Sequence, residues 1–296
     1  RRMILRSLIS IVCCPLIVRR SLFESIRRNK TYLIKGVTLS MHKTFRTLTI
    51  GNSFSQDALA YVHQIARAAG IDWEANNLYI PGCPIDAHHR NYLANAAAYS
   101  LETNGKTTGR MVSINEMLAD GTYDAVTTQQ ASHFSGKPDT YSLLPELISW
   151  IRESQPLAKL YLQETWAYEI DSTHGAFPNY HSDQRYMYEC LRDAYYTYAE
   201  KVGVDVIPTG DVVQYFRENL PRYDYAHGGV SLNRDGFHLS IPYGRYLNSA
   251  VWYETILGGD IRGNAFVPVG VDDVAFLAEI QENVHCYLEN RKKEAK

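Results

Sequence analysis

The sequence has few of the features that mark a metal site or a disulfide framework. It holds five cysteines in 296 residues, with no CxxC motif and no Cys/His pattern of metal-ligand spacing. We therefore expect no bound metal and no disulfide framework. Internal repeats and low-complexity tracts are also absent from the sequence. A composition of 45% hydrophobic and 21% charged residues is ordinary for a globular protein, and it excludes a disordered chain or a polytopic membrane protein.

The net charge of -2 conceals an uneven distribution of charge along the chain. Residues 1–40 contain nine lysines and arginines but a single acidic residue, Glu24, so that 21 basic and 31 acidic residues remain in the body. The first segment thus carries +8 and the body -10. A nucleic-acid-binding surface needs clustered basic residues, and the acidic body therefore argues against a nucleic-acid partner.

The basic segment contains an apolar run at residues 8–18. Eleven residues are too few for a stable membrane span but suit the hydrophobic part of a signal peptide. Arg19 and Arg20 follow directly, however, and no small-x-small cleavage site is present. Two interpretations stay open: residues 1–40 are a degenerate export or anchor sequence, or an extension ahead of a native start at Met41. The first predicts a periplasmic or extracellular protein, and the second a cytoplasmic one.

Beyond Met41, short apolar runs alternate with amphipathic stretches, a pattern typical of β–α–β units and a parallel sheet. Expected strands lie at residues 45–50, 78–80, 123–128, 160–162 and 204–207, with a hairpin at 99–112. One expected helix has Ser55 as its N-cap and ends at Gly70, and others cover residues 144–151, 183–201, 240–252 and 277–288. Residues 41–296 are therefore predicted to form a single three-layer α/β/α domain of the flavodoxin-like class.

In an open parallel sheet, ligands bind at the carboxyl ends of the strands. The sequence GNSFS follows the first expected strand, at residues 51–55. A serine on such a strand-to-helix turn is exposed beside the first amides of the helix, as a nucleophile requires. The same amides could instead hold a phosphate. If Ser55 caps the helix, Ser53 is the candidate nucleophile.

A serine nucleophile needs a general base, and the base needs a carboxylate that orients it. Among the ten histidines, His238 lies in the sequence RDGFHLS, just before an expected helix. Asp235 is three residues earlier, and Gly236 permits the tight bend that returns this carboxylate to the imidazole. The pattern indicates a catalytic triad of Ser53, His238 and Asp235. A surface loop with one acid and one histidine is the alternative.

These two blocks resemble those of the SGNH (GDSL-like) hydrolase superfamily, which has a Gly-Asp/Asn-Ser block after the first strand and an Asp-x-x-His block near the C-terminus. Here they are GNSF at residues 51–54 and DGFH at residues 235–238. The chain is similar to a Bacteroidetes-type, DUF4886-like branch with an IGNSFSQDA opening, an internal QQ and an RDGFHLS ending. The resemblance covers roughly residues 45–260. It implies the SGNH fold and a serine esterase that needs no cofactor.

The resemblance also implies which groups bind the oxyanion of the tetrahedral intermediate. The amide of Ser53 and that of Gly82, which matches the glycine of the superfamily's second block, would donate backbone hydrogen bonds. The third block is normally Gly-x-Asn-Asp, and this chain departs from it with Gln129 and Gln130. A glutamine amide can donate the same bond, and we prefer Gln130, with Gln129 as the alternative. Both glutamines could instead bond only loop backbone.

Aromatic residues suggest the class of substrate. The chain has 22 tyrosines, and several aromatic residues follow the fourth expected strand, on the predicted active-site side. Aromatic rings with polar tips suit sugar faces, so Trp166 and Tyr168 are candidate substrate contacts, with Glu164 as a third. Packing and structural hydrogen bonds are the alternative for each. We expect a small-molecule or glycan ester as the substrate, with an acetyl group on a carbohydrate as the expected ester.

Two other functions stay open. A flavodoxin-like binding protein would use residues 51–55 to hold a phosphate or cofactor, but it leaves Asp235 and His238 without a role. A catalytically inactive carbohydrate-binding relative would keep the fold and lack the chemistry. The sequence indicates neither an oligomeric state nor the identity of the acyl group and the sugar.

Overall fold

The computed structural model describes residues 30–34, 37–41 and 43–294, and the chain divides into two units, Arg1–Lys43 and Thr44–Lys296. In the first unit, strands β1 (Lys30–Ile34) and β2 (Val37–Met41) pair in an antiparallel hairpin. The apolar run at residues 8–18, which is either part of an export or anchor sequence or of an extension ahead of Met41, lies outside the described residues. No helix in the described part of the chain is long and apolar enough to cross a membrane.

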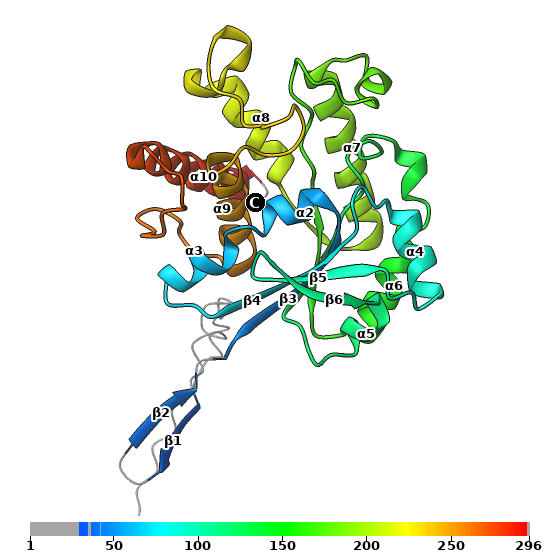
Figure 1. Cartoon of the computed structure of the whole chain (residues 1–296), viewed down its shortest axis with the longest axis vertical. Helices are drawn as coiled ribbons and strands as arrows, with labels where there is room; N and C mark the ends of the chain where they lie inside the picture. The colour runs from blue at the N-terminus through cyan, green and yellow to red at the C-terminus, as the bar shows by residue number, and fades with distance from the viewer. Residues whose placement is uncertain (1–29, 35–36, 42, 295–296) are drawn as a thin grey trace, which may run out of the picture. The chain divides into compact units, whose positions relative to one another are not determined.

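The second unit is built on a seven-stranded sheet in the order β6-β5-β4-β3-β7-β8-β9 (Figure 1). The first five of its strands in chain order are β3 (Phe45–Gly51), β4 (Trp73–Tyr79), β5 (Tyr99–Thr103), β6 (Lys106–Val112) and β7 (Ala125–Thr128). The last two are β8 (Lys159–Gln163) and β9 (Asp205–Ile207). Strands β4, β3, β7, β8 and β9 run parallel, while the β5–β6 hairpin adds an antiparallel edge. Every strand expected from the sequence is present.

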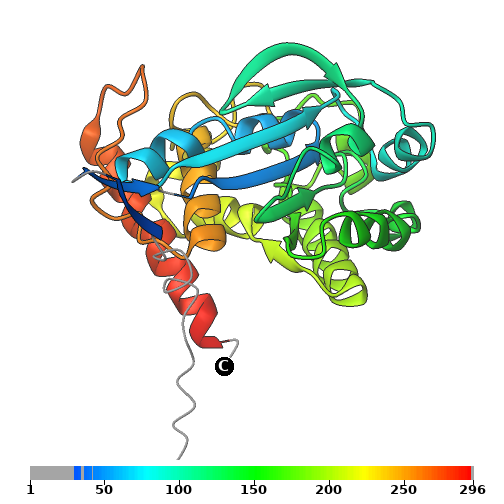
Figure 2. The same ribbon diagram turned by 90° about the horizontal axis from the view of Figure 1, so that it is seen from below.

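Helices pack on both faces of this sheet because its strands bury alternate side chains on opposite sides. On β8, Leu160 and Leu162 belong to one hydrophobic cluster and Tyr161 to the other. The first cluster is completed by α4 (Ile85–Leu93), α5 (Ile114–Leu118), α6 (Leu144–Ser154) and part of α7 (Gln184–Val202). The second includes α2 (Ser53–Ala58), α3 (Val62–Ala68), α8 (Thr209–Asn219), α9 (Tyr243–Leu257) and α10 (Val274–Glu294). Figures 1 and 2 show these layers, and the three-layer α/β prediction is confirmed.

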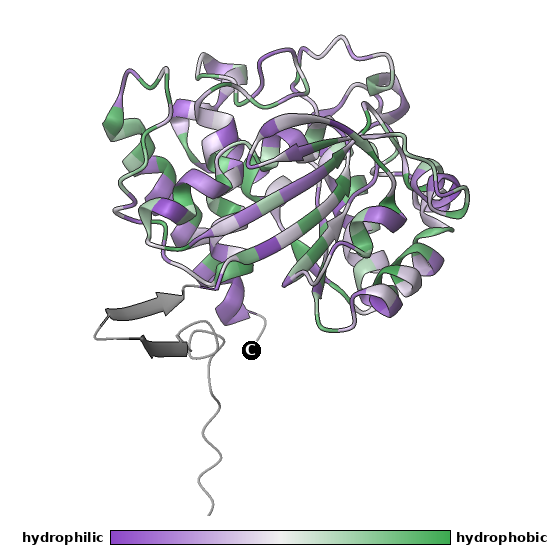
Figure 3. Cartoon of the chain, turned by 60° about the horizontal axis from the view of Figure 1, so that its bottom comes forward, coloured by the Kyte–Doolittle hydropathy of each residue, from purple (hydrophilic) through white to green (hydrophobic). Residues whose placement is uncertain are grey.

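The hydrophobic pattern of the sequence predicted some of the helices and missed others. Hydrophobic and hydrophilic residues are interspersed along each helix (Figure 3), and the predicted apolar face of α10 is buried as expected. Helix α4 was not predicted, since His88 and His89 make its sequence look polar. Both side chains are nevertheless buried, and His88 Nδ1 lies 2.8 Å from the hydroxyl of Tyr99. Helices α5 and α8 were also missed.

The helix expected from Ser55 to Gly70 is in fact two shorter helices, α2 and α3. Asn52, not Ser55, is the N-cap of α2, and its side-chain oxygen accepts a hydrogen bond from the Phe54 amide at 3.0 Å. The Ser55 hydroxyl is instead buried, and it donates to the Asn52 carbonyl and lies 2.8 Å from Asn77 Oδ1. The prediction that Ser55 caps the helix is therefore wrong. Ser53 becomes the first residue of α2.

Candidate active site

The turn between β3 and α2 presents Ser53 at the carboxyl edge of the sheet. Gly51 ends β3, and a Cβ atom at this position would collide with the side chain of Ser55, so the close approach of the two segments requires glycine. Asn52 then caps the helix. Ser53 follows with a partly exposed side chain, while its neighbours Asn52 and Phe54 are buried. The local sequence thus leaves one hydroxyl of the turn accessible.

The structure brings the three residues of the predicted triad together. His238 Nε2 lies 2.9 Å from Ser53 Oγ, and His238 Nδ1 lies 2.7 Å from Asp235 Oδ2. The imidazole is mostly buried, with 18% of its side-chain surface exposed, whereas the carboxylate is 41% exposed. A continuous hydrogen-bonded chain therefore joins the Ser53 hydroxyl to the Asp235 carboxylate through His238, which is 185 residues after Ser53 in the sequence.

The short spacing of Asp235 and His238 is closed by a tight turn. Gly236 adopts a φ of +84°, a conformation that glycine reaches without strain. Asp235 Oδ1 accepts hydrogen bonds from the amides of Phe237, at 3.2 Å, and of His238, at 2.7 Å. Partial burial raises the pKa of Asp235, but these bonds and the one from the imidazole outweigh it and lower the pKa below its usual value. The carboxylate is thus held ionised beside His238.

The residues expected to contact substrate are instead part of the core. Trp166 is fully buried, donates from Nε1 to the carbonyl of Phe237 at 2.7 Å, and stacks on Phe54. Tyr168 is fully buried with its hydroxyl 2.9 Å from Ser132 Oγ. Trp166 therefore stabilises the loop before His238 through its bond to Phe237, and the Tyr168 hydroxyl bonds to Ser132 within the core. The prediction of direct substrate contact is wrong for both, because neither side chain reaches solvent.

Glu164 is also fully buried, and its Oε2 accepts a hydrogen bond from the Asp211 amide at 2.7 Å. Burial and the nearby Asp211 carboxylate raise the pKa of Glu164 well above its usual value. The expected substrate contact of Glu164 is wrong for the same reason. Residue type alone did not separate packing from binding at these three positions.

The two glutamines after β7 have different surroundings. Both polar atoms of the Gln130 side chain bond to backbone groups of nearby segments. Oε1 accepts from the amides of Ile85 and Ala131, and Nε2 lies 3.0 Å from the carbonyl of Thr140. Gln129 Nε2 donates instead to Asn52 Oδ1 at 2.6 Å, on the residue before Ser53. The structure therefore contradicts the preference for Gln130. Gln129, the alternative, is the glutamine that borders the serine turn.

The loop that carries Gly82 is also fastened to this turn, since Asn52 Nδ2 donates to the Cys83 carbonyl at 3.1 Å. Gly82 itself is exposed, with a φ of +58° and no atom within 4 Å of the position that a Cβ would take. The Asn52 side chain thus links the three segments in which oxyanion donors were expected. These are the Ser53 turn, the Gly82 loop and the end of β7.

Partly exposed aromatic rings lie beside His238. The ring of Phe237 is 4.2 Å from that of His238 and 4.8 Å from that of His174, measured between centroids. His174 Nδ1 accepts a hydrogen bond from the Ala176 amide, which leaves Nε2 as the protonated nitrogen of the neutral ring. Burial and the neighbouring His238 lower the pKa of His174 and favour this neutral form. The sequence placed His174 only among aromatic residues after β8 and gave it no role.

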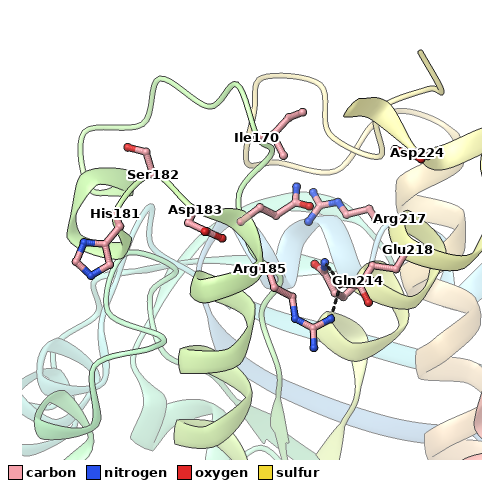
Figure 4. Close-up of a pocket in the computed structure, with 10 residues that line it drawn as sticks. Ile170, His181, Ser182, Asp183, Arg185, Gln214, Arg217, Glu218 and Asp224 are labelled. Atoms are coloured by element: carbon pink, nitrogen blue, oxygen red, sulfur yellow. Dashed lines mark hydrogen bonds and ion pairs between the residues drawn. The ribbon is translucent and has the colours of Figure 1, made fainter. Parts of the chain in front are cut away.

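A polar cavity of about 590 Å³ adjoins the loop that follows β8 (Figure 4). Side chains from the start of α7 lie opposite side chains of α8, and Arg185 forms an ion pair with Glu218 between the two helices. Buried Glu169 connects this region to the loop that carries Asp235 and His238: its amide donates to the Gly236 carbonyl at 2.7 Å, and its carboxylate pairs with Arg217. Among the charged side chains at the cavity, Arg185 and Arg217 are paired with carboxylates, while Asp183 accepts a hydrogen bond from the Tyr186 amide.

One cluster within the described residues has the donor set of a metal site. Atoms of Glu254, Asp260 and His285 lie within 4.8 Å of one another. Each carboxylate already has partners, however, because Glu254 accepts hydrogen bonds from the Ile261 amide and from His285, and Asp260 pairs with Arg262. The cluster is therefore explained as a hydrogen-bonded link between α9 and α10.

Comparison with known proteins gives a family match over most of the chain. The model of the family described as "Domain of unknown function (DUF4886)" matches residues 46–282. The solved structure of a DUF4886 family protein from Bacteroides uniformis is 35% identical, with a TM-score of 0.76, and the match covers 83% of this chain and 95% of that one. No curated protein gives a significant match.

More distant solved structures resemble the chain as well. A candidate SGNH hydrolase from Slackia heliotrinireducens is 17% identical, with a TM-score of 0.49, over 72% of this chain and all of that one. An acetylxylan esterase from Geobacillus stearothermophilus is 15% identical, with a TM-score of 0.46, over 73% and 95% of the two chains. The family match and the 35% identity over most of both chains establish the closer relationship. The chain belongs to the DUF4886 family.

Proposed function

We propose that this protein is a serine esterase in which Ser53 is the nucleophile, His238 the general base and Asp235 the residue that orients the base. The observation that carries the proposal is the unbroken hydrogen-bonded chain from Ser53 Oγ through both imidazole nitrogens to Asp235 Oδ2. Acyl transfer by a serine requires this arrangement of nucleophile, base and orienting carboxylate.

The proposed reaction has two steps. Ser53 Oγ attacks the ester carbonyl while His238 Nε2 takes the hydroxyl proton, and His238 then gives that proton to the departing alcohol as the carbon–oxygen bond breaks. A water molecule next attacks the acyl-enzyme, losing a proton to His238, and the acid leaves as Ser53 regains its hydroxyl. Asp235 stabilises the imidazolium that forms in each step.

Two donors are proposed for the oxyanion: the backbone amides of Ser53 and Gly82. Gln129 Nε2 lies beside Asn52 whereas that of Gln130 lies beside Thr140, but both glutamines are fully buried, so neither is assigned a bond to substrate. Gln129 is proposed instead to hold Asn52, and with it the turn that presents the Ser53 amide. A single oxyanion donor typically contributes about 100- to 1000-fold to the rate. Gly82 lies in an exposed loop that Asn52 holds at this turn through the Cys83 carbonyl.

Hydrolysis of 4-nitrophenyl acetate by the purified full-length chain tests the proposed activity. We expect turnover without added metal or cofactor, and no flavin absorbance in the purified protein. A protein that binds flavin or a phosphate compound and hydrolyses no short-chain ester would support the binding-protein alternative instead. That alternative explains the serine turn but gives the pair of Asp235 and His238 no role.

For the ester itself, we propose an acetyl group on a carbohydrate, with the sugar in the cavity between α7 and α8. Support comes from the connection of that cavity to the loop of Asp235 and His238: Arg217 lines the cavity and pairs with Glu169, whose amide donates to the Gly236 carbonyl. Gln214 lines the cavity, and its buried Oε1 has no hydrogen-bond partner among the described residues. This oxygen has almost no exposed surface, so the proposal requires the side chains that cover it to move aside before a sugar hydroxyl donates to it.

Replacing Gln214 by alanine is therefore expected to lower kcat/KM on acetylated oligosaccharides by about 3- to 10-fold, the effect of one lost hydrogen bond. The rate on 4-nitrophenyl acetate, which has no sugar, should not change. Gln281→Ala is the matched control, since Gln281 is equally buried but bonds to Tyr246 between α9 and α10. Equal losses on both substrates would show that the cavity does not bind the sugar.

A further inference from the structure

A buried carboxylate, Asp57, lies one helical turn after Ser53 on α2. Its side chain has no exposed surface. Both oxygens lie 3.0 Å from Arg234 Nη1, Oδ1 accepts from Arg245 Nε at 2.8 Å, and Oδ2 accepts from the Leu239 amide at 2.8 Å. The two arginines come from different segments, a loop and helix α9, so one carboxylate fastens three parts of the chain together.

The partners of Asp57 bracket the catalytic loop. Arg234 immediately precedes Asp235, and Leu239 immediately follows His238. The Arg234 guanidinium also donates to the Leu239 carbonyl, and the Arg234 amide donates to the His238 carbonyl at 2.9 Å. The two ends of the loop are therefore held to each other and to the helix that begins with Ser53.

We propose that Asp57 is a positioning residue that sets the distance between Ser53 and His238 by binding both ends of the catalytic loop to α2. The inference rests on the proposed esterase function. It assigns a role to Asp57 and Arg234, which stand in the two sequence blocks that contain the triad but take no part in the proton transfers.

The groups around Asp57 restrict which side chain can hold the loop. All of its hydrogen-bonding partners are donors, namely two guanidinium groups and one backbone amide, so position 57 needs a side chain that only accepts. An asparagine has the same shape but keeps only one acceptor oxygen, and its NH₂ group would face donors at the position of the other. With the NH₂ group in place of Oδ2, the bond from the Leu239 amide and one bond from Arg234 are lost. With it in place of Oδ1, the bond from Arg245 and one bond from Arg234 are lost. Either orientation also removes the negative charge that pairs with both arginines, while the packing around residue 57 stays full. An error of about 1 Å in the placement of a catalytic group can cost about 100-fold in rate.

Asp211 provides a matched control for a purely structural role. Its side chain is also fully buried, and it binds two arginines, Arg192 and Arg291, at 3.1 and 2.8 Å. Its other side-chain partners are the hydroxyls of Tyr188 and Tyr196, so within the described residues its hydrogen bonds go to α7 and α10 and not to the catalytic loop. Asp57→Asn and Asp211→Asn therefore make the same chemical change in similar surroundings, and only the first lies at the catalytic loop.

The test compares these two variants of the full chain for reaction of Ser53 with a fluorophosphonate, for kcat and KM on 4-nitrophenyl acetate, and for the imidazole resonances of His238 by NMR. In Asp57→Asn we expect kcat and the labelling rate to fall about 100-fold with little change in KM, and the His238 resonances to shift. Asp211→Asn should lower the melting temperature but leave all of these quantities unchanged in the folded protein. If Asp57→Asn does not fold, Arg234→Lys takes its place with the same expected changes.

If folded Asp57→Asn has the activity and the His238 resonances of the wild-type chain, the positioning role is overturned. Equal losses in both variants would overturn it too, because they would reflect stability alone. If the wild-type chain neither hydrolyses esters nor labels, the proposed function fails. The His238 resonances then still decide whether Asp57 positions the imidazole.

Discussion

Replacing Ser53 by alanine is expected to abolish ester hydrolysis, with a fall in kcat of about 10⁶-fold. The proposed mechanism has no other group that could form the acyl-enzyme. The Ser53 side chain is partly exposed and its hydroxyl bonds to His238, so its removal should leave the fold intact. Initial rates on 4-nitrophenyl acetate and circular dichroism spectra of the two proteins measure both effects.

Ser55→Ala is the control for this substitution. The Ser55 hydroxyl is buried and bonds to Asn52 and Asn77, so its loss should cost about 1 kcal/mol of stability while the folded protein keeps its activity. Undiminished hydrolysis by Ser53→Ala would remove the basis of the proposed function. A loss in Ser55→Ala as large as that in Ser53→Ala would assign the effect to the turn rather than to the nucleophile.

The second large effect is expected for Asp235→Asn, with a fall in kcat of about 10⁴-fold, as for the same change in a serine-protease triad. The asparagine Oδ1 can still accept from the amides of Phe237 and His238, so the loop should hold its shape. Its NH₂ group, however, would donate to His238 Nδ1 and fix the imidazole in the tautomer that cannot accept the Ser53 proton. Steady-state kinetics together with the melting temperature test this expectation.

A second Asp-x-x-His pair supplies the control. His227 Nδ1 lies 2.8 Å from Asp224 Oδ2, with the same spacing as in the catalytic loop, but the His227 side chain is 82% exposed. His227→Gln should therefore leave the rate on 4-nitrophenyl acetate unchanged. Wild-type activity in Asp235→Asn would mean that His238 needs no orienting carboxylate.

The sequence predicted the strands well, and it predicted the two segments that carry Ser53 and the pair of Asp235 and His238. Apolar runs such as Leu160–Leu162 pack on the two faces of the sheet, so their pattern predicts strands directly. The turn after β3 and the block around His238 then follow from the rule that sites lie at the carboxyl ends of parallel strands. The two Asp-x-x-His pairs show the limit of spacing, since only the three-dimensional fold puts His238 against a serine.

The details that the sequence did not predict depend on contacts between distant segments. Gln129 and Gln130 are adjacent and chemically identical, but one side chain meets Asn52 and the other meets Thr140. Trp166 is of a residue type that often contacts sugars, but here its ring is buried in the core and its Nε1 donates to a backbone carbonyl. Asp57 and Arg234 are 177 residues apart, so no local pattern indicates that they meet.

The most direct test of the central claim is covalent labelling of the full chain with a fluorophosphonate, followed by peptide mass spectrometry. A triad that activates Ser53 predicts a single adduct, on Ser53, that is absent from Ser53→Ala and forms far more slowly in His238→Ala. No adduct in folded wild-type protein, or an adduct on another serine, would contradict the assignment of Ser53 as an activated nucleophile.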